Sequence, residues 1–331
     1  MINRALVFSP YFGKLPDNFS LWLKSAERNA DLFDFCVITD DDHEFDLPDN
    51  VSVITTSFEE LREWIQSKFP FKIALTCSYK LCDFKPTYGY VFSELLDMTL
   101  YDYWGICDLD VIFGDLSAFI PHQPYDRINH CGHFSLFRNA SEVNRAFMLN
   151  STAIRYDKIL SNPTHFAFDE NGEYGINAIL RKNGFHIGGF EDDIARITYR
   201  RHNLDVGAEY DRENNKTVSY DKRKRLFAFE EGRLFDYAID HGEIVQREWA
   251  YIHLMRRRMA NLLPTPEERF LISAHAYEPY QAVTLSLIEE KQMDSYYFDY
   301  IKIKARAGVR KARRIATVRM LQMQGQNSGL L

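Results

Sequence analysis

The sequence predicts an α/β protein in which a mainly parallel sheet carries helices on its faces. Short apolar strands alternate with amphipathic helical patterns along the first 110 residues, which is typical of parallel sheets. Hydrophobic residues make up 46% of the 331 residues and aromatic residues 15%, so the chain can form a large core. We therefore expect a folded domain without long disordered segments.

The expected elements follow in chain order. Strands are predicted at 4–9, 33–39, 51–55, 103–107, 131–139 and 249–254, a hairpin at 226–237, and helices near 19–26, 58–69, 86–96 and 174–182. Ser57 and Glu60 have the spacing of a capping box at the start of the second helix. Residues 200–225 are polar and predict a loop. We expect a catalytic domain at 1–262 and a helical appendage with a basic amphipathic tail at 263–331.

Two carboxylates directly follow the most apolar strand. Asp108 and Asp110 are two residues apart, and on an extended chain such residues point to the same face. Two like charges at the end of a buried strand are costly without a cation, and carboxylate oxygens are suitable ligands for a divalent ion. The alternative is an ordinary acidic turn, in which aspartate is common. The pair therefore predicts a metal site, with His253 as a candidate third ligand or else a half-buried structural histidine.

Other candidates follow the predicted strands, because ligands of parallel α/β sheets bind beyond the carboxyl ends of strands. Tyr11, Phe12 and Gly13 follow the first strand, where a ring could stack on a base and glycine could let the base approach. The alternative for them is an ordinary aromatic loop. A second group of candidate nucleotide-binding residues includes cations that could neutralise phosphate, or simply form a solvated face: Lys80, Asp83, Lys85, Arg256 and Arg257.

Asp169 and Glu170 are adjacent carboxylates ahead of a helix. One could cap that helix and the other could contact a substrate hydroxyl, so they are the candidate catalytic pair. His133 beside Gly132 could contact a sugar or pack in the core. The sequence has no phosphate-binding G-x-x-x-x-G-K-[ST] loop and no dinucleotide-binding G-x-G-x-x-G, which argues against nucleoside-triphosphate hydrolysis and dinucleotide binding.

Taken together, several segments resemble a bacterial family of GT-A-type glycosyltransferases from lipopolysaccharide and capsule gene sets. The similar segments are 10–16, 80–86, 104–115, 132–139, 168–170 and 251–254. The resemblance covers about residues 4–258, and a more distant one links the chain to retaining lipopolysaccharide galactosyltransferases and glycogenin. It implies a GT-A-like, Rossmann-type sheet and a Mn²⁺ (or Mg²⁺) ion held by Asp108, Asp110 and His253 against a UDP-sugar. Those enzymes have an Asp-Gln pair where this chain has Asp169-Glu170, which leaves the stereochemical outcome open.

The resemblance leads to a specific expectation of function. The enzyme would move a hexose, with galactose as the first choice and retention preferred, from a UDP-sugar to a lipid-linked oligosaccharide or polysaccharide acceptor. This reaction would serve the synthesis of a surface glycan. Two alternatives remain: a sugar-phosphate nucleotidyltransferase, which also uses paired aspartates, and an inactive glycan-binding scaffold.

Charge is unevenly distributed along the chain. The net charge of −7 argues against nucleic acid as a partner, but eight basic and no acidic residues occur from Lys302 onward. Residues 297–323 could form an interfacial helix on an anionic membrane, or a solvated basic helix. We see no signal peptide or membrane-spanning apolar run, and the five cysteines are expected to be reduced. The expected location is the cytoplasm, at the inner face of the cytoplasmic membrane.

Overall fold

A seven-stranded mixed sheet forms the centre of the computed structural model, which describes residues 2–97, 99–198, 203–255, 257, 259–265, 267–292 and 299–328. The strand order is β3-β2-β1-β4-β7-β6-β8. The bounds are β1 Ala5–Pro10, β2 Phe33–Thr39, β3 Val51–Thr55, β4 Tyr103–Cys107, β6 Arg127–Ile128, β7 Phe134–Arg138 and β8 Ile187–Gly188. Neighbours pair in parallel from β3 to β4 and between β6 and β8, whereas β7 is antiparallel to both of its neighbours. The expected α/β class with a mostly parallel sheet is confirmed.

Helices cover both faces of this sheet, because successive strand residues point to opposite sides. In β1, Leu6 and Phe8 face the core under α2, whereas Val7 faces the core under α1. The helical segments are α1 Phe19–Glu27, α2 Phe58–Ser67, η1 Ser78–Asp83, η2 Lys85–Thr87, α3 Tyr88–Val91, η3 Ser93–Leu95, η4 Leu116–Ala118, α4 Ser141–Asn144, η5 Ala146–Met148, α5 Tyr156–Leu160, α6 Ile176–Lys182 and η6 Glu191–Asp193. The predicted capping box of Ser57 and Glu60 is present at the start of α2.

A small three-stranded sheet, β5-β15-β9, connects the centre to the C-terminal half. Its strands are β5 Val111–Phe113, β9 Ile194–Arg196 and β15 Tyr251–His253. β15 is antiparallel to β5 and parallel to β9, with His253 opposite Val111 and opposite Arg196. This pairing brings the late histidine next to the turn that contains the two aspartates.

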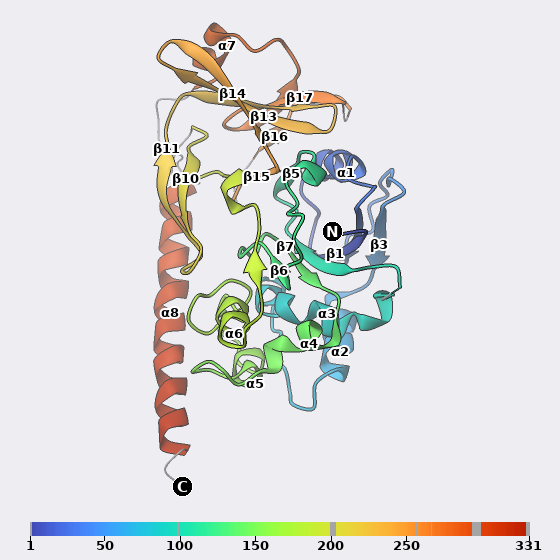
Figure 1. Cartoon of the computed structure of the whole chain (residues 1–331), viewed down its shortest axis with the longest axis vertical. Helices are drawn as coiled ribbons and strands as arrows, with labels where there is room; N and C mark the ends of the chain where they lie inside the picture. The colour runs from blue at the N-terminus through green and yellow to red at the C-terminus, as the bar shows by residue number, and fades with distance from the viewer. Residues whose placement is uncertain are drawn as a thin grey trace.

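The C-terminal region differs from the expected helical appendage. A six-stranded sheet of order β14-β13-β12-β17-β18-β16 lies above the central sheet in Figure 1. Its strands are β12 Arg225–Glu230, β13 Arg233–Asp240, β14 Glu243–Trp249, β16 Ala260–Asn261, β17 Arg269–Ile272 and β18 Ala276–Pro279, and α7 Leu285–Glu290 follows them. β12 pairs with β17, so hydrogen bonds cross the expected boundary at residue 262. One sheet therefore includes strands from both sides of residue 262.

Two further differences concern local elements. The expected loop at 200–225 contains a hairpin of β10 Val206–Asp211 and β11 Lys216–Asp221. The hairpin expected at 226–237 is present as β12 and β13, with Leu226 opposite Tyr237 and Phe229 opposite Leu234. All five cysteines are free thiols in the structure.

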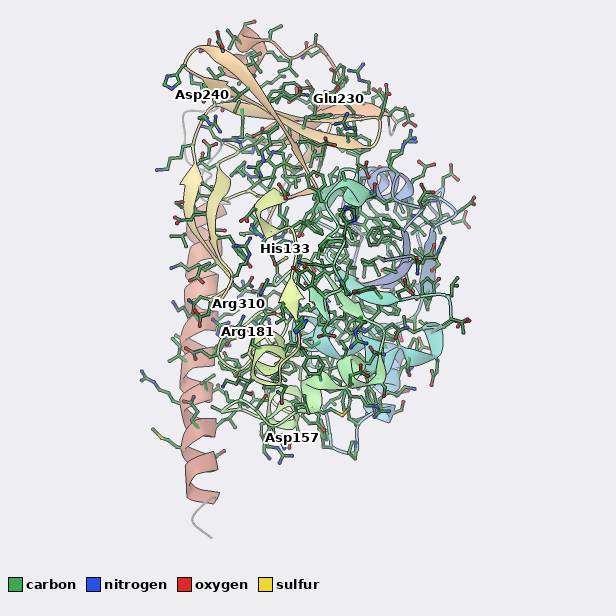
Figure 2. All side chains as sticks on the ribbon, in the orientation of Figure 1. His133, Asp157, Arg181, Glu230, Asp240 and Arg310 are labelled. Atoms are coloured by element: carbon green, nitrogen blue, oxygen red, sulfur yellow. The ribbon has the colours of Figure 1, made fainter. Side chains whose placement is uncertain are left out.

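The long helix α8, Asp299–Ser328, runs along one side of the molecule (Figure 1). Its inner side contacts the core region, where the Thr317 hydroxyl lies 3.2 Å from that of Thr164, and Val318 and Leu321 pack on the α2-side core. Figure 2 shows Arg310 on the side of α8 that faces the rest of the chain, where its guanidinium lies over the Tyr79 ring. Among the described residues, no helix has the length and apolar character to cross a membrane.

Candidate functional site

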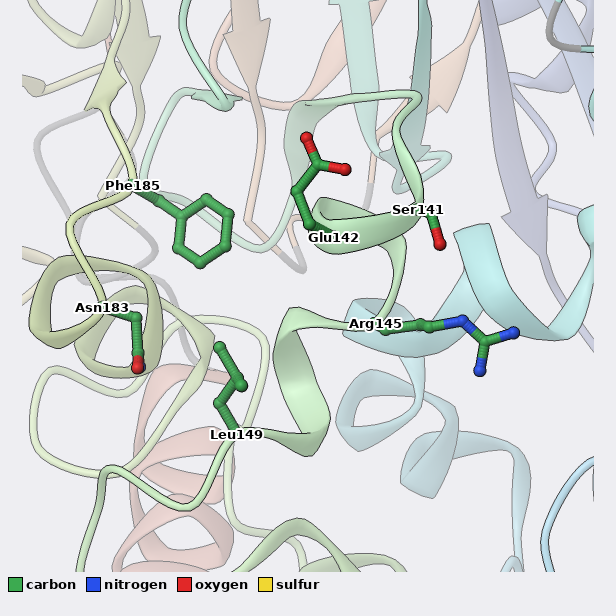
Figure 3. Close-up of a pocket in the computed structure, with 6 residues that line it drawn as sticks. All are labelled: Ser141, Glu142, Arg145, Leu149, Asn183 and Phe185. Atoms are coloured by element: carbon green, nitrogen blue, oxygen red, sulfur yellow. The ribbon is translucent and has the colours of Figure 1, made fainter.

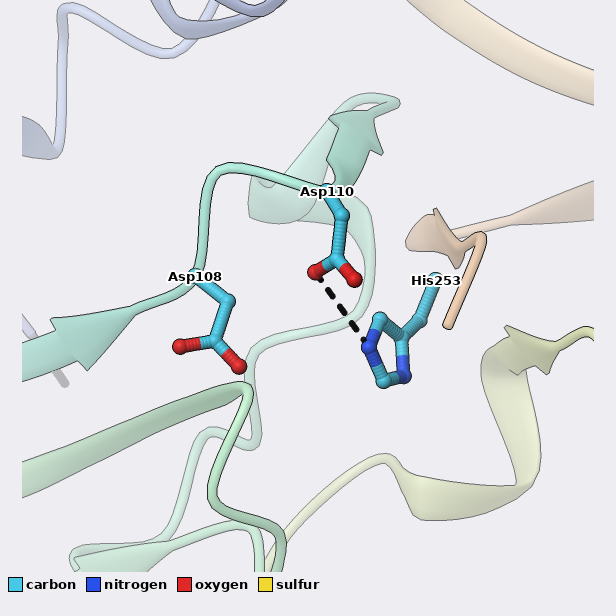
Figure 4. Close-up of side chains that lie close together, drawn as sticks. All are labelled: Asp108, Asp110 and His253. Carbon is cyan, nitrogen blue, oxygen red and sulfur yellow. Dashed lines mark ion pairs between the residues drawn. The ribbon is translucent and has the colours of Figure 1, made fainter. Parts of the chain in front are cut away.

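The turn after β4 and the end of β15 bring together two carboxylates and an imidazole. Ligand atoms of Asp108, Asp110 and His253 all lie within 4.8 Å of one another. His253 Nε2 is 3.3 Å from Asp110 Oδ1, and Figure 4 shows the two side chains pointing toward each other. The backbone fixes this arrangement, because Asp108 N–H donates to the His133 carbonyl (2.9 Å) and Leu254 N–H donates to that of Asp110 (3.0 Å). The two carboxylates converge through a bend between β4 and β5, not along an extended strand.

The imidazole of His253 is held mainly by stacking. Its ring lies on that of His133 with centroids 3.9 Å apart, and the Tyr251 hydroxyl lies 3.0 Å from His133 Nδ1. Burial lowers the pKa of His133 well below its ordinary value, and the charges of His253, Arg196 and Lys85 lower it further. Neutral His133 can therefore stack on His253 without charge repulsion. Within the described part of the chain, the buried Nδ1 of His253 has no hydrogen-bond partner.

The three side chains could together hold a divalent metal ion. Two ligands at right angles around an octahedral ion, each at about 2.1 Å, are about 3 Å apart. The 3.3 Å between His253 Nε2 and Asp110 Oδ1 is close to that value. Two carboxylates with one imidazole are a donor set that suits Mn²⁺ better than Ca²⁺.

Lys85 links the cluster to the second carboxylate pair. Its ammonium donates to Asp108 Oδ1 at 2.6 Å and to the Gly132 carbonyl at 2.7 Å, and it lies 3.8 Å from Asp169 Oδ2. Burial alone would lower the pKa of Lys85, but the charges of Asp108 and Asp169 hold it well above the ordinary value. Lys85 is therefore charged and orients one carboxylate of each pair.

Asp169 and Glu170 lie next to Gly132. A Cβ on Gly132 would be 2.3 Å from Asp169 Oδ2 and 3.2 Å from Glu170 Oε2, so only glycine fits between these groups and the chain. Burial, together with the neighbouring charge of Glu170, raises the pKa of Asp169 well above its ordinary value. Asn215, in the turn of the β10–β11 hairpin, donates to Glu170 Oε2 at 3.0 Å. The two carboxylates are thus close together but differ in environment.

Some residues that shape the site gave no distinctive signal in the sequence. Arg127 is fully buried and donates to the Asp169 carbonyl (3.1 Å), the Cys131 carbonyl (3.2 Å) and Asn177 Oδ1 (2.8 Å). It fixes the backbone on both sides of the carboxylate pair. An arginine in a two-residue strand cannot be distinguished in sequence from a surface residue.

Lys80 and Asp83 do not lie where the sequence predicted a nucleotide contact. Both are buried, and they form an ion pair of 2.7 Å. Lys80 also donates to the Ile159 and Thr164 carbonyls, and Asp83 accepts the N–H groups of Phe166 and Phe168. The pair therefore holds the loop that leads into Asp169, which is a structural role.

Residues after β1 approach the cluster to different extents. Burial raises the pKa of Tyr11, and the charge of Asp110, one of the metal candidates, raises it further. Phe12 instead packs edge-on against Phe58 of α2. Gly13 has φ of +99° and its N–H donates to Asp40 at 2.6 Å, so glycine serves the turn itself.

The two candidate arginines have different outcomes. Arg256 lies outside the described residues. Arg257 is buried and its guanidinium donates to the carbonyls of Thr198, Asn203 and Ala274 at 2.7 to 2.8 Å. These contacts connect segments of the C-terminal half, which differs from the phosphate contact that the sequence suggested.

One hollow on the surface lies apart from the cluster. An open depression is lined by Ser141, Glu142, Arg145, Leu149, Asn183 and Phe185 (Figure 3). None of these residues belongs to the predicted site, and Leu149 and Phe185 give the depression an apolar lining. The candidate site therefore rests on the arrangement of its side chains.

Comparison with known proteins gives a family without an assigned activity. No curated protein matches the chain. The model of a family of unknown function matches residues 7–281, which include both carboxylate pairs and His253. Because this match spans most of the chain, the protein belongs to that family, DUF6625.

Proposed function

We propose that the protein is a metal-dependent glycosyltransferase that moves a hexose from a UDP-sugar to a glycan acceptor. The observation that carries the proposal is the convergence of Asp108, Asp110 and His253 within 4.8 Å at the carboxyl end of β4. Further support comes from the second carboxylate pair, which Lys85 joins to this cluster. A GT-A-like fold and galactose as the hexose belong to the proposal.

Each side chain has a role in this mechanism. Asp108, Asp110 and His253 would hold Mn²⁺ or Mg²⁺. Bound there, the ion supplies a Lewis acid that stabilises negative charge on the departing diphosphate by several kcal/mol. Lys85 keeps Asp108 and Asp169 in fixed positions and adds positive potential beside the leaving group.

Asp169 and Glu170 would act on the sugars. In the retaining reaction that we favour, they bind hydroxyl groups of the donor or acceptor sugar, while the departing phosphate takes the acceptor proton. In an inverting reaction, Asp169 would take that proton, and a raised pKa suits a carboxylate to this task near neutral pH. The anomeric configuration of the product distinguishes the two.

A panel of nucleotide sugars tests the proposed function. With Mn²⁺ present, we expect one UDP-sugar to raise the melting temperature of the protein more than free sugars or nucleoside triphosphates do. The same UDP-sugar should release UDP when an acceptor is added. Release of pyrophosphate from a nucleoside triphosphate and a sugar phosphate would instead identify a nucleotidyltransferase. Absence of any response to Mn²⁺ and all nucleotides would favour a glycan-binding scaffold.

The proposal places the acceptor at an anionic membrane surface, with α8 as the contact. Among described α8 residues, Val309, Ile315, Met320 and Met323 are exposed, and so are Lys311, Arg313 and Arg319. Exposed apolar groups mixed with bases suit anionic phospholipid, and α8 has no acid after Asp299. The enzyme would then work at the inner face of the cytoplasmic membrane on a lipid-linked acceptor.

Vesicle flotation tests this contact. Arg313→Glu/Arg319→Glu should lose low-salt binding to vesicles that contain anionic lipid. The charge-matched control Arg62→Glu/Lys72→Glu changes a half-buried and an exposed base at or after α2 and should bind as wild type does. Equal binding of both double variants would contradict the role of α8.

A further inference from the structure

Arg196 lies beside the metal candidates but has no assigned role. It is the last residue of β9, and its Cα is the partner of the His253 Cα in the parallel β9–β15 pair. Paired residues on neighbouring strands project to the same face of a sheet. Its charge also contributes to lowering the pKa of His133, the ring that stacks on His253. Arg196 therefore belongs to the same group of side chains as the cluster.

The guanidinium of Arg196 is buried but only partly satisfied. It is 4% exposed, its Nη1 donates to the Glu191 carbonyl at 2.6 Å, and one face lies 3.8 Å from the Tyr210 ring centre. Its Nε and Nη2 are buried and have no hydrogen-bond partner within the described residues. Burying N–H donors of a charged group without acceptors is costly, and native proteins seldom keep such an arrangement without a use for it.

Two other candidate cations that the structure describes are already engaged. Lys85 contacts Asp108, the Gly132 carbonyl and Asp169. Arg257 donates to three backbone carbonyls. By contrast, Arg196, whose Cα is paired with that of His253, has two N–H-bearing nitrogens without a partner among the described residues, and a guanidinium matches phosphate oxygens well.

We propose that Arg196 binds the diphosphate of the nucleotide sugar, beside the ion held by Asp108, Asp110 and His253. This inference rests on the proposed function and adds the residue that recognises the second phosphate. Nε and Nη2 are out of contact with solvent, so neighbouring side chains have to move aside for the ligand to reach them. Because guanidinium N–H groups donate in the plane of the group, the Tyr210 ring can stay on its face.

A comparison of two buried arginines separates a ligand role from a structural one. Arg196→Gln loses the hydrogen bond to the Glu191 carbonyl and the Tyr210 ring contact, but it also removes a buried charge with two unsatisfied nitrogens. These effects offset each other, so the melting temperature without ligand should stay near the wild-type value. Its affinity for UDP with Mn²⁺ should fall about 10-fold to 100-fold, the effect of one or two charge-assisted hydrogen bonds, while that for UMP changes little. Arg257→Gln, the matched control, should lower the melting temperature because three carbonyls lose their donor.

Calorimetric titrations with UDP, UMP and inorganic pyrophosphate, each with Mn²⁺, give the result. Arg196→Lys keeps the charge and should restore part of the UDP and pyrophosphate affinity. If Arg196→Gln does not fold, Arg196→Lys takes its place in the titrations. Unchanged UDP affinity in Arg196→Gln would overturn the inference while leaving the proposed function intact. So would an Arg196→Lys variant that is less stable and loses affinity for UDP and for UMP to the same extent. A wild-type protein that binds none of the three ligands would contradict both.

Discussion

Lys85 joins the two carboxylate pairs, so its removal should affect stability through Asp169. Lys85→Met breaks contacts to Asp108, the Gly132 carbonyl and Asp169. Losing one partner of a buried ion pair typically costs about 3–5 kcal/mol. The Asp108 side chain is 40% exposed, however, so water screens that half of the interaction. We therefore expect a loss of about 2–4 kcal/mol in the free energy of unfolding, most of it from Asp169 and the carbonyl.

A double-mutant cycle isolates the contribution of Asp169. The Asp169 side chain is 6% exposed, and after Lys85→Met it has to keep an uncompensated charge or take up a proton, either of which costs stability. Asp169→Asn removes this cost, so the double variant should be about 1–2 kcal/mol more stable than Lys85→Met alone.

Urea unfolding at pH 7, followed by the fluorescence of the four tryptophans, measures each free energy. The cycle compares wild type, both single variants and the double variant. A coupling below about 0.5 kcal/mol would refute the reasoning, because independent sites add to within that value.

Three further outcomes follow from the site. Gly132→Ala places a Cβ 2.3 Å from Asp169 Oδ2 and should displace that carboxylate. Turnover should therefore fall sharply, whereas calorimetry should show unchanged Mn²⁺ binding. Turnover equal to that of wild type would argue against a substrate role for Asp169. Lys80→Met leaves the fully buried Asp83 unpaired and should cost about 3–5 kcal/mol in urea unfolding; a cost under about 1 kcal/mol would contradict the assigned role. Because burial raises the pKa of Asp169, its contribution to stability is complete below the ordinary pKa of 3.8 and is lost as pH rises through the folded-state pKa. The melting temperature of Asp169→Asn, measured relative to that of wild type, should therefore rise from pH 4 to pH 8. A difference between the two melting temperatures that stays constant with pH would be inconsistent with a raised pKa.

Local patterns predicted the part of the site that lies on the central sheet. An apolar run that ends in two aspartates defines both the end of β4 and the chemistry after it. The position of His253 beside them depends on the pairing of β15 with β5, which connects residues about 140 positions apart. No local pattern encodes that pairing, and His253 was a candidate ligand chiefly because of the family resemblance.

Charged residues were the least predictable. Lys80, Asp83 and Arg257 have the residue types of a phosphate or metal site. Lys80 instead pairs with Asp83, which also accepts backbone N–H groups of a distant loop, and Arg257 donates to backbone carbonyls. Arg196 was not a candidate, because only the register of β9 and β15 reveals its neighbour. β17 and β18 are four residues long, and such short strands are easily missed when an appendage is expected to be helical.

Metal binding by the Asp108–Asp110–His253 cluster is the central claim, and a calorimetric titration of Mn²⁺ into metal-free protein tests it most directly. Asp110→Asn keeps the shape of the side chain and removes one charged ligand atom, and Asp115→Asn, on the other side of β5, is the matched control. The account predicts one Mn²⁺ per chain in wild type and in the control, with affinity at least about 10-fold weaker in Asp110→Asn. No saturable binding by wild type, or equal affinity in all three proteins, would contradict it.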